Sequence, residues 1–441
     1  MNFKKYKLGE ILNVTRGASL SGEFYTTEGE YIRLTCGNFD YQNNCFKENK
    51  SKDNIYYVGD FKSEFLMNKG DLITPLTEQA IGLLGSTAII PESGKYIQSQ
   101  DIAKIVCREN LLDKNFAFYL ISSTIVKQQL AAAAQQTKIR HTSPDKIKNC
   151  IVWIPELTEQ KRIGKLLRTL DYKIELNRAI NQNLEAMAKQ LYDYWFVQFD
   201  FPNEDGKPYK SSGGKMVWND KLKRDIPEGW KVSMLANEVD LQYGFPFSTE
   251  LFTEQETMVP VVRIRDILNN TISTYTTEEV EEKYLLKKQD LLIGMDGNFH
   301  INYWTDNKSY LNQRSVRLRA SKSSNVSIVQ VKYDIQPYIK AKEARAKGST
   351  VGHLSDKDMK ELYVLVCPNK KTKEKFDSIL SLIITNRNEI ELLTKQRDEL
   401  LPLLMNGQVS VNSDLAAILN LFPKKALFIN IRGYIPIKSL N

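Results

Sequence analysis

Cations and amides are the side chains of this sequence best suited to chemistry with a partner. Lysine and arginine can contact phosphates, arginine can also pair with both acceptors of a guanine, and amides can pair with an adenine. The candidate contact residues in the first half of the chain are Arg16, Arg33, Thr137, Lys138, Arg140 and His141. The candidates in the second half are Arg263, Arg265, Arg345, Lys347, Ser349, Thr350 and His353. Further amides with the right groups to read adenine are Gln79, Gln100, Asn298, Asn312 and Gln313.

Most of these candidates fall in two loops at corresponding places in the sequence. Residues 137–142 follow an alanine-rich segment, and residues 345–353 follow a second helical segment. The recurrence of cations in both loops favours contact with a nucleic acid. The alternative for each loop is a solvated helix end whose cations lie near the negative end of the helix dipole. His141 and His353 fit a structural hydrogen-bonding role better than base recognition.

Three of the candidate arginines fall in segments with strand composition. Arg33, Arg263 and Arg265 have apolar neighbours, so each strand is predicted to expose the face that carries the guanidinium. A surface salt bridge on that face is the competing interpretation.

The sequence lacks the motifs of the common catalytic sites. It has no glycine-rich dinucleotide loop, no Asn-Pro-Pro-Tyr or Asp-Pro-Pro-Tyr segment, no His-Glu-x-x-His motif and no cysteine–histidine zinc pattern. The spacing of the three histidines, His141, His300 and His353, suggests no catalytic or metal cluster. We therefore predict a binding protein with no catalytic residues, metal or cofactor of its own.

Apolar residues recur at sevenfold spacing within residues 156–200 and 369–408, which predicts two long helices. These helices must position the candidate side chains. The seam of the first helix is formed by Ile163, Leu167, Leu170, Ile174, Leu184 and Leu191. The seam of the second is formed by Phe376, Leu380, Ile383, Ile390, Leu401 and Leu404. Asn177 and Asn181 lie on the first seam, where buried amides select one register. We predict that the helices pair antiparallel, and that Pro402 kinks or ends the second near Leu401.

The two helices belong to a repeated unit. Phe376 lies 213 residues after Ile163, and Leu404 lies 213 residues after Leu191. Nearly the same offset aligns the segments that precede the helices, for example residues 99–105 with residues 312–318. Residues between such anchors have little in common. This pattern predicts two recognition domains that share one backbone fold and recognise different targets.

The predicted fold class is mixed α/β, with two similar α/β recognition domains separated by two long antiparallel coiled-coil helices in a pseudo-twofold internal repeat. Shorter helices are expected over residues 115–134 and 333–347. The expected boundaries are 1–155 for the first recognition domain, 156–200 for the first spacer helix, 201–225 for a flexible linker, 226–368 for the second recognition domain, 369–408 for the second spacer helix and 409–441 for a tail of unassigned structure.

The composition is compatible with this plan. The 441 residues carry a formal net charge of +8, which suits a polyanionic partner without requiring one. The five cysteines are odd in number and form no Cys-x-x-Cys pair, which is typical of reduced thiols in a cytosol. No apolar run approaches a membrane span, and the start of the chain lacks the apolar run of a signal peptide, so a cytoplasmic location is expected.

Three motifs, taken with the repeat, identify a family. Ile-Pro-Glu-Gly-Trp at residues 226–230 opens the second unit, Tyr-Trp-Phe-Val-Gln-Phe-Asp at 194–200 closes the first long helix, and Leu-Leu-Pro-Leu-Leu-Met-Asn-Gly at 400–407 closes the second. The chain resembles the specificity subunit of type I restriction-modification enzymes, in order and nearly throughout, to about Val411.

The resemblance implies a subunit that binds double-stranded DNA, each recognition domain reading one half of a bipartite target while the helices fix the gap. It also implies two modification (methyltransferase) subunits as partners, joined by restriction/translocase subunits, with S-adenosylmethionine, ATP and Mg²⁺ bound by those partners. Two other interpretations stay open. One is a stand-alone DNA methyltransferase or nuclease with unrecognised motifs, and the other is a coiled-coil scaffold that binds only proteins.

Overall fold

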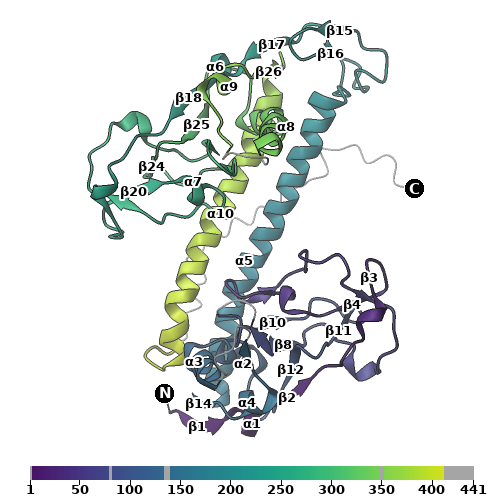
Figure 1. Ribbon diagram of the computed structural model, residues 1–441, viewed down its shortest axis with the longest axis vertical. Coiled ribbons are helices and arrows are strands. Elements are labelled where there is room, and N and C mark those ends of the chain that lie inside the picture. The colour runs from purple at the N-terminus through teal and green to yellow at the C-terminus, as the bar shows by residue number, and fades with distance from the viewer. Residues whose placement is uncertain (1, 79–81, 134–139, 347–351, 412–441) are drawn as a thin grey trace. The chain divides into compact units, whose positions relative to one another are not determined.

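The structure is a computed structural model that describes residues 2–78, 82–133, 140–346 and 352–411. It divides into two compact units, of which the first comprises Met1–Tyr172 with Thr394–Asn441 and the second comprises Lys173–Leu393. The long helices α5 (Leu157–Tyr192) and α10 (Lys370–Met405) each contribute to both units (Figure 1). Each unit therefore contains the start of one long helix and the end of the other.

Two four-stranded sheets form the body of the first unit. The antiparallel central sheet has the order β10-β8-β12-β2, with β2 (Leu12–Arg16), β8 (Leu72–Pro75), β10 (Ala88–Ile89) and β12 (Ile102–Cys107). The second sheet has the order β11-β4-β7-β3, with β3 (Tyr25–Thr26), β4 (Tyr31–Arg33), β7 (Tyr56–Tyr57) and β11 (Tyr96–Ile97). The other strands pair in twos: β1 (Lys4–Lys7) with β14 (Ile151–Ile154), β5 (Phe39–Asp40) with β6 (Cys45–Phe46), and β9 (Thr77–Glu78) with β13 (Arg140–His141). The shorter helices are α1 (Leu8–Ile11), α2 (Lys114–Ile121), α3 (Thr124–Ala133) and α4 (Pro144–Lys148).

The central sheet of the first unit is buried on both faces. Successive residues of a strand point to opposite faces. In β8, Leu72 accordingly belongs to the main core and Ile73 to a second cluster. The main core also contains Phe116 of α2, Ile163 of α5 and Leu404 of α10. The sheet and both long helices therefore share one core in this unit.

The second unit has its own set of sheets. Its central sheet has the order β18-β25-β22-β23, with β18 (Val239–Tyr243), β22 (Leu291–Gly294), β23 (Ile301–Tyr303) and β25 (Ser315–Ala320). The second sheet has the order β19-β21-β20-β24, with β19 (Phe252–Thr253), β20 (Val259–Val262), β21 (Tyr275–Thr276) and β24 (Tyr310–Leu311). Pairs are formed by β15 (Met216–Asn219) with β16 (Arg224–Pro227), and by β17 (Lys231–Met234) with β26 (Tyr363–Val366). The shorter helices are α6 (Leu235–Glu238), α7 (Ile264–Ile267), α8 (Ile328–Ala346) and α9 (Asp356–Lys360).

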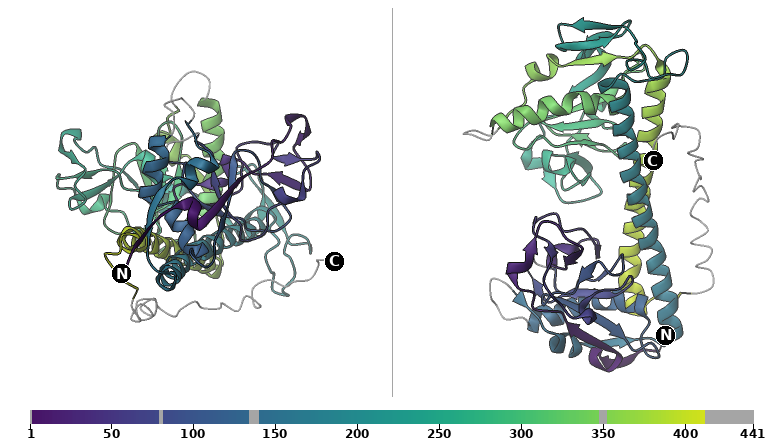
Figure 2. Two further views of the ribbon diagram at one scale, coloured as in Figure 1. Left: turned by 90° about the horizontal axis from the view of Figure 1, so that it is seen from below. Right: turned by 90° about the vertical axis from the view of Figure 1, so that its right-hand side faces the viewer.

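The two units repeat one topology. The central order β2-β12-β8-β10 of the first corresponds to β18-β25-β22-β23 of the second, and β11-β4-β7-β3 corresponds to β24-β20-β21-β19. The parallel pairing of β11 with β4 recurs between β24 and β20. The long helices are also equal, at 36 residues each. The predicted internal repeat and mixed α/β class are therefore confirmed (Figure 2).

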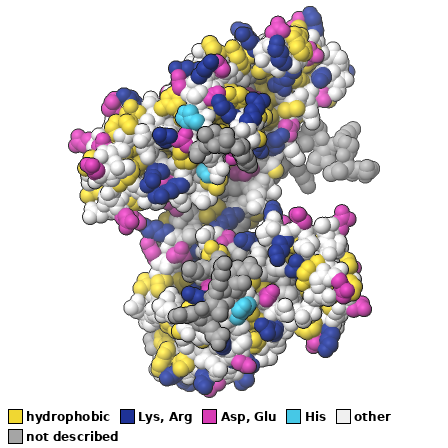
Figure 3. Space-filling view, viewed as in Figure 1, with side chains coloured by type: hydrophobic (Ala, Val, Ile, Leu, Met, Phe, Trp, Pro, Cys, Tyr) yellow, Lys and Arg dark blue, Asp and Glu magenta, His cyan; other side chains and the backbone are white. Residues whose placement is uncertain are grey.

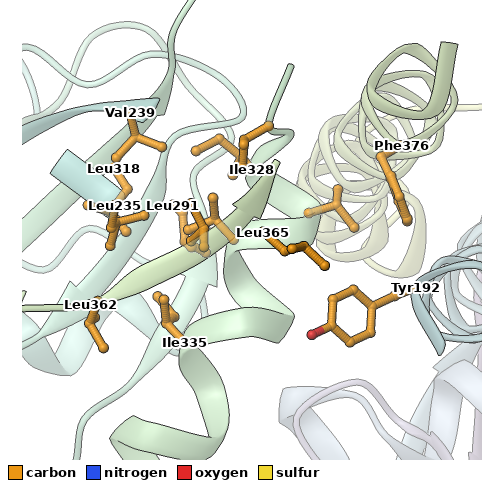
Figure 4. Packing of buried hydrophobic residues seen from close by; sticks show 14 of the residues in the cluster. Tyr192, Leu235, Val239, Leu291, Leu318, Ile328, Ile335, Leu362, Leu365 and Phe376 are labelled. Carbon is orange, nitrogen blue, oxygen red and sulfur yellow. The ribbon is translucent and has the colours of Figure 1, made fainter. Parts of the chain in front are cut away.

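The core of the second unit joins its sheet to both long helices. Figure 4 shows Leu318 of β25, Leu365 of β26 and Ile335 of α8 packed in one cluster with Tyr192 of α5 and Phe376 of α10. All five side chains are buried. This arrangement repeats the one in the first unit with the roles of the helices exchanged.

The long helices pair antiparallel in the second unit. The Asn181 side-chain amide donates to the Ile383 carbonyl oxygen at 3.3 Å, and Asn386 donates to Asn181 Oδ1 at 3.0 Å. Phe196 follows the end of α5, and its ring lies 6.2 Å from that of Phe376 in α10. Residue numbers therefore rise along α5 in the direction in which they fall along α10. The prediction that buried amides occupy the seam is confirmed for Asn181, and Asn177 is buried beside it.

The first unit shows the same antiparallel arrangement through an ion pair. Arg397 Nη1 lies 2.9 Å from Asp171 Oδ1, and each side chain is at most one-tenth exposed. Tyr119 of α2 donates a short hydrogen bond to the other oxygen of Asp171. At the far end, the Val411 N–H donates to Glu159 Oε1 at 3.1 Å. This pair accommodates a guanidinium on the inward face of α10.

The predicted seam residues are all buried or half-buried. The buried ones are Ile163, Leu167, Leu170, Ile174, Phe376, Leu380, Ile383 and Leu404, and the half-buried ones are Leu184, Leu191, Ile390 and Leu401. The sevenfold spacing therefore locates the inward face of each helix correctly.

Two shorter helices differ from their predicted spans. The helix expected over 115–134 is interrupted between α2 and α3, because the Ser122 and Ser123 hydroxyls donate to the Phe118 and Leu120 carbonyl oxygens. The helix expected over 333–347 begins earlier, at Ile328, because Ser327 Oγ accepts the Val329 N–H at 3.0 Å. The predicted end at Lys347 lies outside the described residues.

The linker differs from expectation, and α10 does not end at Pro402. Residues 201–225 were predicted to be flexible, but Phe201 stacks on Trp195, Tyr209 and Trp230, and β15 and β16 form a hairpin. Aromatic anchors thus order a segment rich in glycine and serine. Pro402 neither ends nor breaks α10, which continues to Met405 with the Asn406 N–H donating to the Pro402 carbonyl oxygen at 3.0 Å. Pro402 therefore removes one intrahelical hydrogen bond without ending the helix.

Candidate nucleic-acid interface

A polar groove opens on the second unit. Its volume is about 460 Å³, and it is lined by Arg263, Ile264, Arg265, Asn298, His300, Asn312, Gln313 and Arg314. Three guanidinium groups, three amides and one imidazole thus converge, with Ile264 as the one aliphatic residue. On the face shown in Figure 3, histidine and basic side chains lie near one another in this unit. This is a set of donors suited to phosphates and base edges.

Three loops bring these side chains together. Arg263 precedes α7 and Arg265 lies within it, the loop between β22 and β23 carries Asn298 and His300, and the turn between β24 and β25 carries Asn312, Gln313 and Arg314. The Asn312 N–H donates to the Val262 carbonyl oxygen at 3.0 Å, which ties the first turn to the third.

A glycine makes the approach of the third turn possible. A Cβ at Gly244 would lie 1.9 Å from the Asn312 carbonyl oxygen, so only glycine fits beside it. Gly17 meets the Gln98 carbonyl oxygen in the same way at 2.2 Å in the first unit. The repeat therefore conserves this close backbone contact in both units.

The guanidinium groups of Arg263 and Arg265 are held mainly by hydroxyls. Arg263 Nη1 donates to Thr274 Oγ1 at 3.3 Å, while Arg265 Nε and Nη2 donate to Ser273 Oγ at 3.2 and 3.1 Å. The Asp266 carboxylate is 4.0 Å from Arg265. The hydroxyl that holds Arg263 does not cancel its charge, and the Asp266 carboxylate offsets the charge of Arg265 only in part at 4.0 Å, so both arginines can attract an anion.

A hydrogen-bonded triad borders the groove. Arg314 Nη1 donates to Asp296 Oδ2 at 2.7 Å, and His353 Nδ1 lies 2.6 Å from Asp296 Oδ1. Burial alone would raise the pKa of Asp296, but the hydrogen bonds from Arg314 and His353 outweigh burial and lower this pKa. Asp296 is therefore a carboxylate at neutral pH and holds both partners in place.

The first unit carries a corresponding set with different residues. Thr77 Oγ1 donates to Asp101 Oδ1 at 3.0 Å and lies 3.4 Å from His141 Nδ1. Beside it, Arg140 Nη1 is 3.6 Å from Oε2 of the buried Glu78. The cation predicted here is thus present but has an acidic partner.

The other predicted residues have the following places. Arg16 is exposed, and its Nε donates to the Gln100 carbonyl oxygen at 3.0 Å. Arg345 is exposed in the last turn of α8. Six predicted residues lie outside the described part of the chain: Gln79, Thr137, Lys138, Lys347, Ser349 and Thr350.

Two expectations about the arginines in strands are wrong. Arg33 is only 7% exposed, because its guanidinium lies 3.8 Å from the Tyr25 ring and donates to the Asn54 carbonyl oxygen. The strand predicted through Arg263 and Arg265 ends at Val262, because Asp266 accepts the Arg263 N–H at 3.0 Å and turns the chain into α7. Arg33 is thus an interior residue, whereas the turn places Arg263 and Arg265 in the groove.

Arg314 and Asp296 are the site residues that sequence reasoning missed. Their signal was present, because the repeat aligns residues 312–318 with residues 99–105 and so sets Arg314 against Asp101. A reversal of charge at an aligned position between two copies of a domain marks a place where the copies differ in what they contact.

The described residues offer little sign of other site types. No group of three or more histidine, cysteine or acidic residues in the described part of the chain is placed to hold a metal ion. Among the described helices, none is both long and apolar enough to cross a membrane.

Comparison with known proteins gives a consistent result. Residues 1–186 and 227–400 match the family described as the type I restriction modification DNA specificity domain. The MjaIX specificity subunit of Methanocaldococcus jannaschii is 22% identical over 71% of this chain and 73% of its own length. The HindI specificity subunit of Haemophilus influenzae is 22% identical over 71% of this chain and 81% of its own. The crystal structure of a type I restriction-modification S subunit from M. genitalium has a TM-score of 0.59 at 17% identity, covering 92% of this chain and 96% of that one.

The family match falls on both copies of the repeat and stops short of the hairpin between them. It therefore covers both four-stranded sheets of each unit, the groove and most of both long helices. Together with the repeated α/β topology, it shows that this chain belongs to the family of type I restriction-modification specificity subunits, which supply DNA recognition and not catalysis.

Proposed function

We propose that each unit of this specificity subunit reads one half of a bipartite DNA target, and that α5 and α10 set the unread gap. The observation that carries the proposal is one backbone frame holding different polar side chains at equivalent positions. The groove of the second unit offers three arginines and three amides. The recognition domains span residues 1–155 and 226–368, with spacer helices over 156–200 and 369–408.

The length and pairing of the helices support the role of a spacer. A 36-residue helix is about 54 Å long at 1.5 Å per residue. Half-sites on one face of B-DNA recur about every 34 Å. The hydrogen bonds of Asn181 with Asn386 and Ile383 fix one register, so the helices resist sliding.

The catalytic steps belong to partner subunits in this proposal. Two modification subunits would bind S-adenosylmethionine and methylate the DNA, and restriction subunits would supply ATP- and Mg²⁺-dependent translocation. Leu176 and Ile180 support docking on the helices, because they are exposed apolar residues one turn apart on α5. A cytoplasmic location follows from the same proposal, and the five free cysteines suit a reducing compartment.

The proposal is tested by adding components in turn to the purified chain. Alone, it should bind DNA with an affinity that falls steeply with salt and should transfer no methyl group from S-adenosylmethionine. With modification subunits, methyl transfer to DNA should appear. Methylation or cleavage by the chain alone would assign it to an enzyme, and salt-independent or absent DNA binding would assign it to a protein scaffold.

A further inference from the structure

Three residues of the second unit occupy the same places as three residues of the first. The Leu76 N–H donates to the Asp101 carbonyl oxygen, and the Met295 N–H donates to the Arg314 carbonyl oxygen. Antiparallel pairing joins His141 to Thr77 and His353 to Asp296. Thr77, Asp101 and His141 thus correspond to Asp296, Arg314 and His353.

The charge at these places differs between the units. The residue immediately before β12 in the first unit is the acidic Asp101, and the residue immediately before β25 in the second unit is the basic Arg314. The residue beside it compensates, since neutral Thr77 donates to Asp101 whereas the Asp296 carboxylate accepts from Arg314. Both units therefore hold a polar side chain at this position through one hydrogen bond. Asp101 accepts that bond in the first unit, whereas Arg314 donates it in the second.

Arg314 is presented toward the groove in a defined position. Its side chain is 66% exposed although Asp296 holds its Nη1. Its backbone φ is +64°, a left-handed conformation that residues with a Cβ seldom adopt. No partner of its Nε or Nη2 is found in the described part of the chain. That edge of a guanidinium has the spacing to meet O6 and N7 of a guanine together.

We propose that Arg314 is the residue by which the second unit recognises a guanine, with Asp296 positioning it. The inference rests on the proposed function of this unit as a DNA reader. Asp296 fixes the guanidinium before DNA binds, which reduces the freedom lost on contact. Asn312 and Gln313, the two residues before Arg314, line the same groove beside it.

The test uses the full chain assembled with its modification subunits. It compares the methylation motif and the relative binding of DNA duplexes between wild type and variants. The Arg314→Ala variant should lose discrimination for guanine at one position of one half-site, by about ten- to a hundredfold in relative binding of duplexes that differ at that base. The other half-site should keep its bases. Lys322→Ala is the matched control, since it removes one exposed cation of this unit that does not line the groove, and it should leave the motif unchanged.

A second variant guards against simple loss of folding. Asp296→Thr combined with Arg314→Asp copies the residues of the first unit onto the same frame, so it should fold and still lose the guanine. An acidic acceptor at this place favours a base with an amino donor, such as cytosine. Arg314→Lys should lose most of the discrimination, because a single ammonium does not span both acceptors.

Three results would overturn the inference. The first is retention of guanine by either Arg314→Ala or the double variant, and the second is a wild-type motif without guanine in one half. The third is an equal loss for all duplexes with a salt slope reduced by about one, which would make Arg314 a phosphate contact. Failure of the proposed function looks different, because the wild-type complex would then show no sequence preference at all.

Discussion

At the scale of residues, the partners of each arginine decide how much of its guanidinium is available to DNA. The guanidinium of Arg265 is held by the hydroxyl of Ser273 with the Asp266 carboxylate 4.0 Å away, whereas Arg140 lies 3.6 Å from the buried Glu78. The types of these residues could be predicted from the sequence, but their partners could not. Glu78 and Arg140 are 62 positions apart, and only the pairing of β9 with β13 brings them together. Arg33 shows the same limit, since the ring that buries it comes from another strand.

Arg265→Ala is expected to weaken binding without changing the motif. Arg265 lines the groove, its side chain is 59% exposed and its guanidinium donates to the Ser273 hydroxyl, which suits a phosphate contact. Affinity should fall by a similar factor for every duplex, and the slope of log affinity against log salt should decrease by about one. Fluorescence anisotropy over a salt series with matched and mismatched duplexes measures both. A loss confined to one base at one position would instead make Arg265 a base reader.

The pKa of Asp296 predicts an acid-dependent stability. This pKa is lowered in the folded protein, so the carboxylate contributes stability above its unfolded value near 4 and loses that contribution as pH falls through the folded value. Asp296→Asn should therefore be less stable than wild type at pH 7, and the difference should shrink below about pH 4. Hydrogen exchange of the β25 amides over a pH series follows it. A difference independent of pH would contradict this role for the carboxylate.

At the scale of elements, the sevenfold spacing was enough to predict both long helices, and the repeat was enough to predict a second copy of the sheet. The spacing of apolar residues could not predict where side-chain contacts interrupt a helix or order a linker. Ser122 and Ser123 divide α2 from α3 through their hydroxyls, and Phe201 orders a linker whose glycines suggested mobility. Such contacts depend on side-chain geometry that a periodic pattern does not contain.

The buried pair of Asp171 and Arg397 is expected to matter for the first unit. Arg397→Met leaves the Asp171 carboxylate buried with its main cation removed, which should cost about 3 kcal/mol. Hydrogen exchange in the α10 end of the first unit measures the change locally. Replacing both residues, with Asp171→Leu and Arg397→Met, should restore much of the loss, because the buried carboxylate is then removed together with its main cation. Equal destabilisation by the single and double changes would show that packing and not charge is responsible.

At the scale of the whole molecule, one chain carries two copies of a recognition unit and two helices that serve both. The repeat lets the units diverge in the groove while the sheets and seams stay alike, as the contrast of Asp101 with Arg314 shows. The sequence predicted this plan because the offset of 213 residues is visible without structure. The bases read by each unit depend on loops that have little in common between the copies.

Lengthening both helices should lengthen the gap and nothing else. Seven residues inserted after Arg178 in α5 and after Glu389 in α10 add about 10.5 Å, or about three base pairs, while keeping the apolar seam in phase. Both half-sites should keep their bases in the methylation motif. Insertion of the same seven residues in α5 alone is the control and should abolish specific methylation, because it puts the paired seams out of step. An unchanged gap in the double insertion would refute the role of the helices as a spacer.

The most direct measurement is a map of methylated sites in host DNA, made with and without this chain while its modification subunits are present. Two readers joined by a fixed spacer predict that the sites lost with the chain share one motif, made of two short blocks of defined bases separated by a constant number of unread bases. A single continuous motif, or a gap that varies from site to site, would contradict the account.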